Sequence, residues 1–164
     1  MRRTSTSSAG SAASSCAGQR GSSFDTRRSI WLNRARRSPP PCRSHLTGNG
    51  DAHAKNLAIV HQPPGEWRAS PAFDLPSSYL YGDRTVALPV AGRSGADLPR
   101  RAFVELGGRL NLPEPAIGSA LDDLCDRVDS WLPDLESLPF PASQLRKLRR
   151  TIGYRRRLLR GLAA

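Results

Sequence analysis

Long hydrophobic runs and paired cysteines are missing from this sequence. No apolar stretch approaches the ~20 residues that a membrane-spanning helix needs, so we expect a cytoplasmic protein without membrane contact. Cys16, Cys42 and Cys125 are far apart and odd in number, which argues against both a disulfide framework and a zinc site. The three histidines recur every eight residues, a spacing that fits neither one helix face nor a usual set of metal ligands.

Acidic residues are nearly absent from both ends of the chain. Residues 1–45 contain nine Arg and one Asp, and residues 141–164 contain eight basic groups and no acid. Residues 46–140 contain eight basic and thirteen acidic groups. The net charge of +11 therefore belongs to the two ends, which are the candidates for contact with nucleic acid.

Residues 1–45 also lack hydrophobic periodicity. This segment has eleven Ser, repeated Arg and three consecutive prolines, and its longest apolar pattern is Ser29-Ile30-Trp31-Leu32. Because little apolar area can offset the entropy cost of ordering, we predict that residues 1–45 are disordered. Their composition is also typical of an organelle transit peptide and of a GC-rich gene translated out of frame. We favour the out-of-frame interpretation over the transit peptide.

Residues suited to phosphate chemistry are concentrated in two motifs. The first is Gly48-Asn49-Gly50-Asp51-Ala52-His53-Ala54-Lys55-Asn56, and the second is Pro71-Ala72-Phe73-Asp74-Leu75. In phosphoryl transfer, one carboxylate orients the attacking hydroxyl, while a carboxamide and a second carboxylate hold Mg²⁺ on the nucleotide phosphates. Asp51, Asn56 and Asp74 meet this demand. Asn49-Gly50 is also an ordinary hairpin turn, but a turn alone leaves Asp74 unexplained.

In content, order and spacing, the two motifs resemble the C-terminal half of the HipA-type toxin kinases. These are serine/threonine protein kinases of bacterial toxin–antitoxin systems. The resemblance runs from about Leu46 to about Leu159. It implies a kinase-like C-lobe over residues 46–161, with the N-lobe absent, and it implies an antitoxin protein and a protein substrate as partners.

The resemblance also implies roles for individual residues. Asp51 would be the catalytic base, and Asn56 and Asp74 would be the ligands of Mg²⁺ bound with ATP. His53 and Lys55 would support the binding of this cofactor.

A Gly-rich loop and a Lys that could contact the nucleotide phosphates are missing before Asp51, where every basic residue is Arg. Because kinases work by positioning and electrostatics, we expect that the chain alone binds Mg²⁺ and ATP weakly, if at all, and does not phosphorylate protein. One alternative is a small-molecule phosphotransferase of the aminoglycoside or choline kinase type, which also uses Asp-x-x-x-x-Asn. Another is a non-catalytic protein that binds nucleic acid through its basic ends.

The pattern of residues predicts a mostly α-helical fold with a short β-hairpin around the catalytic loop. Strands are predicted over residues 57–61, 66–69 and 85–90, the first two joined by the turn Gln62-Pro63-Pro64-Gly65. A helix capped by Asp97 reaches Leu110, and an amphipathic core helix runs from Ile117 to Leu132.

A final helix carries Leu145, Leu148, Ile152 and Leu159 on one side, and eight basic residues cover the rest. These basic residues either dock on the acidic middle of the chain or contact DNA, acidic tRNA or an antitoxin. They are Arg146, Lys147, Arg149, Arg150, Arg155, Arg156, Arg157 and Arg160.

Overall fold

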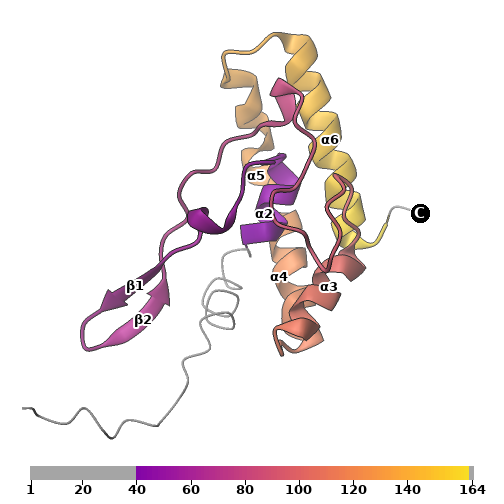
Figure 1. The fold of residues 1–164 in the computed structure, drawn as a ribbon. Helices are drawn as coiled ribbons and strands as arrows, with labels where there is room; N and C mark the ends of the chain where they lie inside the picture. The colour runs from indigo at the N-terminus through magenta and orange to yellow at the C-terminus, as the bar shows by residue number, and fades with distance from the viewer. Residues whose placement is uncertain (1–39, 163–164) are drawn as a thin grey trace, which may run out of the picture.

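The computed structural model describes residues 40–162 of the 164, so our predictions for residues 1–39 lie outside it. This part is mostly helical with one two-stranded antiparallel sheet, as predicted (Figure 1). In chain order the elements are α2 (Pro40–Thr47), the 3₁₀ helix η1 (Ala54–Asn56), β1 (Ile59–Gln62), β2 (Glu66–Ala69), the 3₁₀ helix η2 (Tyr79–Tyr81), α3 (Arg100–Arg109), α4 (Glu114–Asp126), α5 (Val128–Trp131), the 3₁₀ helix η3 (Leu132–Ser137) and α6 (Ala142–Arg160).

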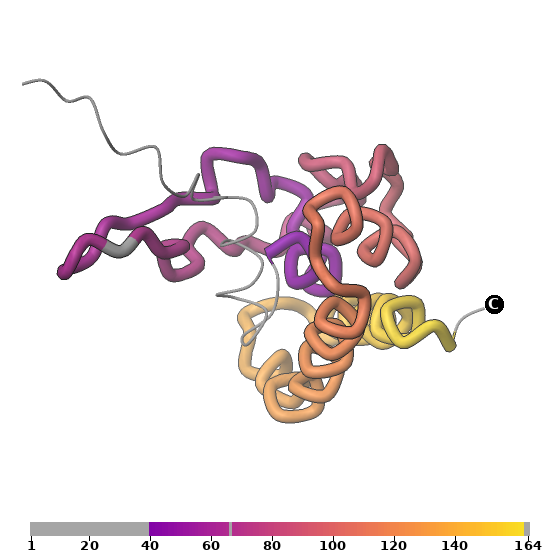
Figure 2. The backbone as a smooth tube through the Cα atoms, turned by 90° about the horizontal axis from the view of Figure 1, so that it is seen from below, coloured from indigo at the N-terminus to yellow at the C-terminus, as the bar shows by residue number. Residues whose placement is uncertain are grey.

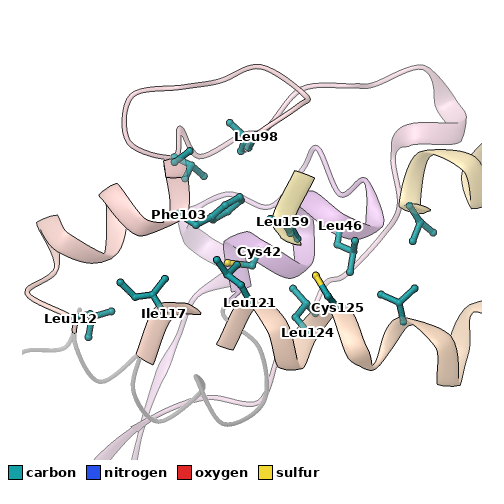
Figure 3. Packing of buried hydrophobic residues seen from close by; sticks show 14 of the residues in the cluster. Cys42, Leu46, Leu98, Phe103, Leu112, Ile117, Leu121, Leu124, Cys125 and Leu159 are labelled. Atoms are coloured by element: carbon teal, nitrogen blue, oxygen red, sulfur yellow. The ribbon is translucent and has the colours of Figure 1, made fainter. Parts of the chain in front are cut away.

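Helix α2 lies inside the helical body, against α4 and α6 (Figure 3). Its Cys42 and Leu46, one helical turn apart, are fully buried in a core that also contains Phe103 and Leu121. We expected residues 40–45 to belong to the disordered segment, but they form most of this helix. Only two apolar side chains tie α2 to the core, which is too few to produce a visible helical period.

The predicted core helix forms as α4, which buries Ile117, Leu121, Leu124 and Cys125 on one face. Cys125 is fully buried and is packed as a small apolar side chain. The helix does not run unbroken to Leu132, because α4 ends at Asp126 and is followed by the short α5 and η3.

Helices α3 and α4 pack closely at Gly107 of α3. A Cβ built at this position would lie only 2.0 Å from the Ile117 Cδ1 atom. Glycine weakens a helix interior, and here its missing side chain makes room for α4. The predicted cap of α3 is wrong, since Pro99 occupies the N-cap and no side chain caps this end.

Helix α6 docks on the acidic middle of the chain, as one of our two interpretations predicted. Three of its arginines form ion pairs with acids that precede it: Arg149 with Glu136, Arg156 with Asp129 and Arg160 with Asp126. Arg155, which we expected on the exposed basic face, is instead 3% exposed.

The hairpin β1–β2 projects from one side of the helical body (Figure 2). Its register pairs Ile59 with Ala69 and Gln62 with Glu66. The predicted third strand, over residues 85–90, is wrong. The structure has only an isolated bridge there, between Val90 and Arg93, where the backbone turns tightly. The preceding residue, Pro89, has no N–H to donate to a ladder.

None of the helices within residues 40–162 combines the length and the apolar character needed to cross a membrane.

Candidate phosphoryl-transfer site

The first motif begins where the chain leaves α2. Gly48 has a φ of +74°, a conformation that turns the backbone out of the helix and favours glycine. Its carbonyl oxygen accepts hydrogen bonds from the Ser78 N–H at 3.0 Å and the Tyr79 N–H at 3.2 Å. The Asn49 N–H donates back to the Ser44 carbonyl at 2.9 Å. The loop is therefore tied both to α2 and to the segment around Ser78.

The next two residues, Asn49 and Gly50, fix the conformation of the loop that leads to Asp51. The Gly50 N–H donates to the Ser78 hydroxyl at 2.7 Å, and a Cβ on Gly50 would lie 2.1 Å from an Asp83 carboxylate oxygen. Asn49 is 2% exposed, and its side-chain oxygen accepts the Asp51 N–H at 3.0 Å. The backbone at Asp51 is held in place while its carboxylate is exposed to solvent.

A short internal hydrogen-bond pattern shapes the rest of the first motif. The His53 N–H donates to the Asn56 side-chain oxygen at 3.1 Å, and the Asn56 N–H donates to the His53 carbonyl at 3.0 Å. Both side chains are half-buried, whereas Lys55 between them is exposed. This arrangement orients the amide group of Asn56.

The second motif returns to the first through the hairpin. After β2, the Ser70 N–H donates to the Ala58 carbonyl at 2.8 Å, which continues the pairing toward the motif. The Asn56 amide nitrogen then donates a hydrogen bond to the Asp74 carboxylate. Asp74 itself has a φ of +52°, a conformation that is uncommon for a residue with a side chain and is found at strained functional positions.

Four polar residues from the two motifs line one cleft: Asn49, His53, Asn56 and Asp74. The rest of its wall is apolar apart from Ser44 and comes from Pro40, Pro41, Ala52, Leu57, Ala72, Phe73, Leu75, Val86, Leu88 and Val90. Asp51 and Lys55 are not among the lining residues. Within the described part of the chain, Asn49 Nδ2 and His53 Nδ1 are buried without a hydrogen-bond partner.

The donor set at the cleft suits a magnesium ion that arrives with a nucleotide. The side-chain oxygen of Asn56, which also accepts the His53 N–H, and the Asp74 carboxylate are the hard oxygen ligands that Mg²⁺ prefers. Among residues 40–162, no group of three or more His, Cys, Asp and Glu could form a metal cage. Mg²⁺ is commonly bound by one or two carboxylates together with substrate phosphates, so the residues present fit that mode.

Sequence reasoning missed the residues that hold the loop in place, above all Ser78. It lies 28 residues after Gly50, in a serine- and tyrosine-containing stretch without a recognisable motif. Asn49 was interpreted only as a turn residue, although it is buried at the cleft. Contacts between such distant positions leave no pattern in a single sequence.

Comparison with known proteins gives the family of this chain. Residues 42–132, more than half of the chain, match the HipA-like C-terminal domain. The chain belongs to this family.

The chain spans only part of the length of two similar proteins. A protein of Sinorhizobium fredii (strain NBRC 101917 / NGR234) named "Putative kinase Y4dM" is 29% identical over 103 residues, which make up 60% of this chain and 25% of that protein. The solved complex of the Shewanella oneidensis MR-1 toxin–antitoxin system HipA, HipB and its operator DNA contains a chain with the same fold. That match has a TM-score of 0.60 at 21% identity and covers 73% of this chain and 30% of the other.

Proposed function

We propose that this chain supplies the catalytic and magnesium-binding part of a HipA-like serine/threonine protein kinase. Such a kinase transfers the γ-phosphoryl group of ATP to a protein hydroxyl. The observation that carries the proposal is the contact between Asn56 and Asp74 at a cleft beside the loop that bears Asp51. Family membership supports it independently.

Each residue has a distinct part in the proposed reaction. Asp51 accepts a hydrogen bond from the attacking hydroxyl and takes its proton. Asn56 and Asp74 hold Mg²⁺, which neutralises charge on the β- and γ-phosphates when it is bound. His53, in the cleft, and Lys55, on the exposed side of the same turn, support the nucleotide.

The proposal requires nucleotide contacts beyond those of these 164 residues. The chain spans only about a quarter of its curated relative and 30% of the matched structure. We expect no transfer from radiolabelled ATP to protein by this chain alone. A site that supplies only half of the phosphate contacts does not hold ATP in the geometry that transfer requires. Transfer that disappears in Asp51→Ala would contradict this expectation.

The proposed partners follow from the family and from α6. The matched solved complex includes HipB and operator DNA, and we propose an antitoxin protein and DNA as partners here too. Four exposed basic residues of α6 form no ion pair within residues 40–162: Arg146, Lys147, Arg150 and Arg157. If they contact DNA phosphates, affinity should fall with salt by a log–log slope of about −0.9 per contact. A slope near zero would rule out this contact.

Metal and nucleotide binding tests the central assignment without requiring turnover. Because the chain alone should bind the metal and nucleotide weakly, electron paramagnetic resonance follows the depletion of free Mn²⁺ in the presence of ADP at high protein concentration. We expect Asp74→Asn to weaken binding roughly tenfold or more, as for loss of a charged interaction of about 1.5–3 kcal/mol. Asp123→Asn, at an exposed acid of α4 outside the cleft, is the matched control. Equal binding by both variants would overturn the assignment.

A further inference from the structure

Arg155 is the one arginine of α6 that is buried, with 3% of its surface exposed. Its Nη1 donates a hydrogen bond of 2.8 Å to the carbonyl oxygen of His45, 110 residues earlier in the chain. His45 belongs to the last turn of α2, directly before the catalytic loop. The C-terminal helix is thus joined to the backbone from which Asp51 is presented.

The same guanidinium touches the other side of the loop. It lies 5.4 Å from the centre of the Tyr79 ring, a distance typical of a cation–π contact. A Cβ on Gly48 would lie 3.3 Å from Arg155 Nη1 and 2.8 Å from the Tyr79 Cβ, so the Gly48 backbone is enclosed between these two side chains. Gly48 is also the residue whose carbonyl oxygen receives the Ser78 and Tyr79 amides.

Burying the Arg155 guanidinium in this way is energetically unfavourable. A buried cation loses its hydration, and that loss is usually offset by a carboxylate partner. Among residues 40–162, no carboxylate lies within ion-pair distance of Arg155, and its Nε has no hydrogen-bond partner. Burial lowers the pKa of Arg155, an effect that the more distant charge of Asp97 counteracts. An apolar residue could fill the same volume without this penalty.

We infer that Arg155 is a positioning residue that fixes the loop from Gly48 to Asp51 by clamping His45 and Tyr79 together across it. The inference rests on the proposed function only in taking Asp51 as the reactive group. Arg155 itself acts through the backbone. Loss of the clamp should release the loop locally and leave the helical core intact.

Hydrogen exchange of backbone amides, measured by NMR on the full chain, tests this inference. In Arg155→Met, the amides of Asn49, Gly50 and Asp51 should exchange roughly tenfold faster or more, as expected for loss of a charge-assisted hydrogen bond. Amides in the middle of α4 should keep their rates. Arg149→Met is the control, because Arg149 is on the same helix but makes an exposed ion pair.

Arg155→Lys keeps the charge and a hydrogen-bond donor but not the planar fork, so its loop should be protected better than that of Arg155→Met. If Arg155→Met does not fold, Arg155→Lys carries the test, since its loop amides should still exchange faster than those of the unaltered protein. Unchanged loop exchange, or a rise shared equally by the loop and α4, would overturn the inference. The measurement uses no metal or nucleotide. Its failure is therefore distinct from failure of the proposed function, which would appear as metal binding that does not depend on Asp74.

Discussion

Acidification should destabilise this protein through His45. The imidazole is 1% exposed, and within the described residues neither ring nitrogen has a hydrogen-bond partner. Burial, and secondarily the positive charge of Arg155, lowers the pKa of His45 from its ordinary value of 6.5 to about 3. The folded state therefore keeps this ring neutral, whereas the unfolded chain binds a proton as the pH falls through about 6.5.

The sign and size of the effect follow from linkage. Because the unfolded state binds more protons below pH 6.5, stability falls with decreasing pH until the folded-state pKa is reached. Between about pH 7.5 and about pH 5 the loss should be about 2 kcal/mol, with the folded pKa at about 3. Carboxylates whose pKa an ion pair lowers, such as Asp122 beside Arg100, stabilise the fold above about pH 4, and this stabilisation is lost only as the pH falls below that value.

Urea denaturation followed by far-ultraviolet circular dichroism measures this loss directly. The free energy of unfolding of the unaltered protein should drop by about 2 kcal/mol between these two pH values. His45→Gln removes the titrating group, so its stability should be nearly the same at both. An equal drop in His45→Gln, or no drop in the unaltered protein, would refute the reasoning.

Three further substitutions or treatments probe the fold. Gly48→Ala should destabilise the protein by about 2 kcal/mol or more in the same urea assay, since it combines a positive φ with a steric clash; a change near zero would contradict the loop geometry. Burial shields Cys42 and Cys125 from solvent and raises the pKa of both thiols, so Ellman's reagent should label them only after denaturation. Rapid labelling of either thiol in the native protein would contradict their burial. Arg100 joins α3 to α4 and to the end of α6, so Arg100→Ala should lower the free energy of unfolding by about 1–2 kcal/mol. Arg109→Ala, at an exposed ion pair, should change it little. Equal effects of the two substitutions would contradict this difference.

Local sequence signals predicted much of the fold. The apolar residues of α4 recur at helical spacing, and the Pro-Pro-Gly turn marked the hairpin, so both elements were visible without a structure. The spacing of Asp51, Asn56 and Asp74 suggested one site, and the structure places Asn56 against Asp74.

The remaining features depend on contacts between distant parts of the chain. Helix α2 was missed because only Cys42 and Leu46 anchor it in the core. The burial of Arg155 was missed because its hydrogen-bond partner, His45, lies 110 residues away. A helical pattern shows which side of a helix is polar, but it does not show that one arginine on that helix will be enclosed.

The most direct test of the account is to locate the metal site itself. Mn²⁺ added with ADP to isotope-labelled protein broadens the NMR signals of the nearest amides first. The amides of Asn56 and Asp74 should broaden at the lowest Mn²⁺ concentrations, and Asp74→Asn should shift this broadening to concentrations roughly tenfold higher or more. Broadening that begins instead at the exposed acids of α4, Asp122 and Asp123, would contradict a phosphoryl-transfer site at the cleft.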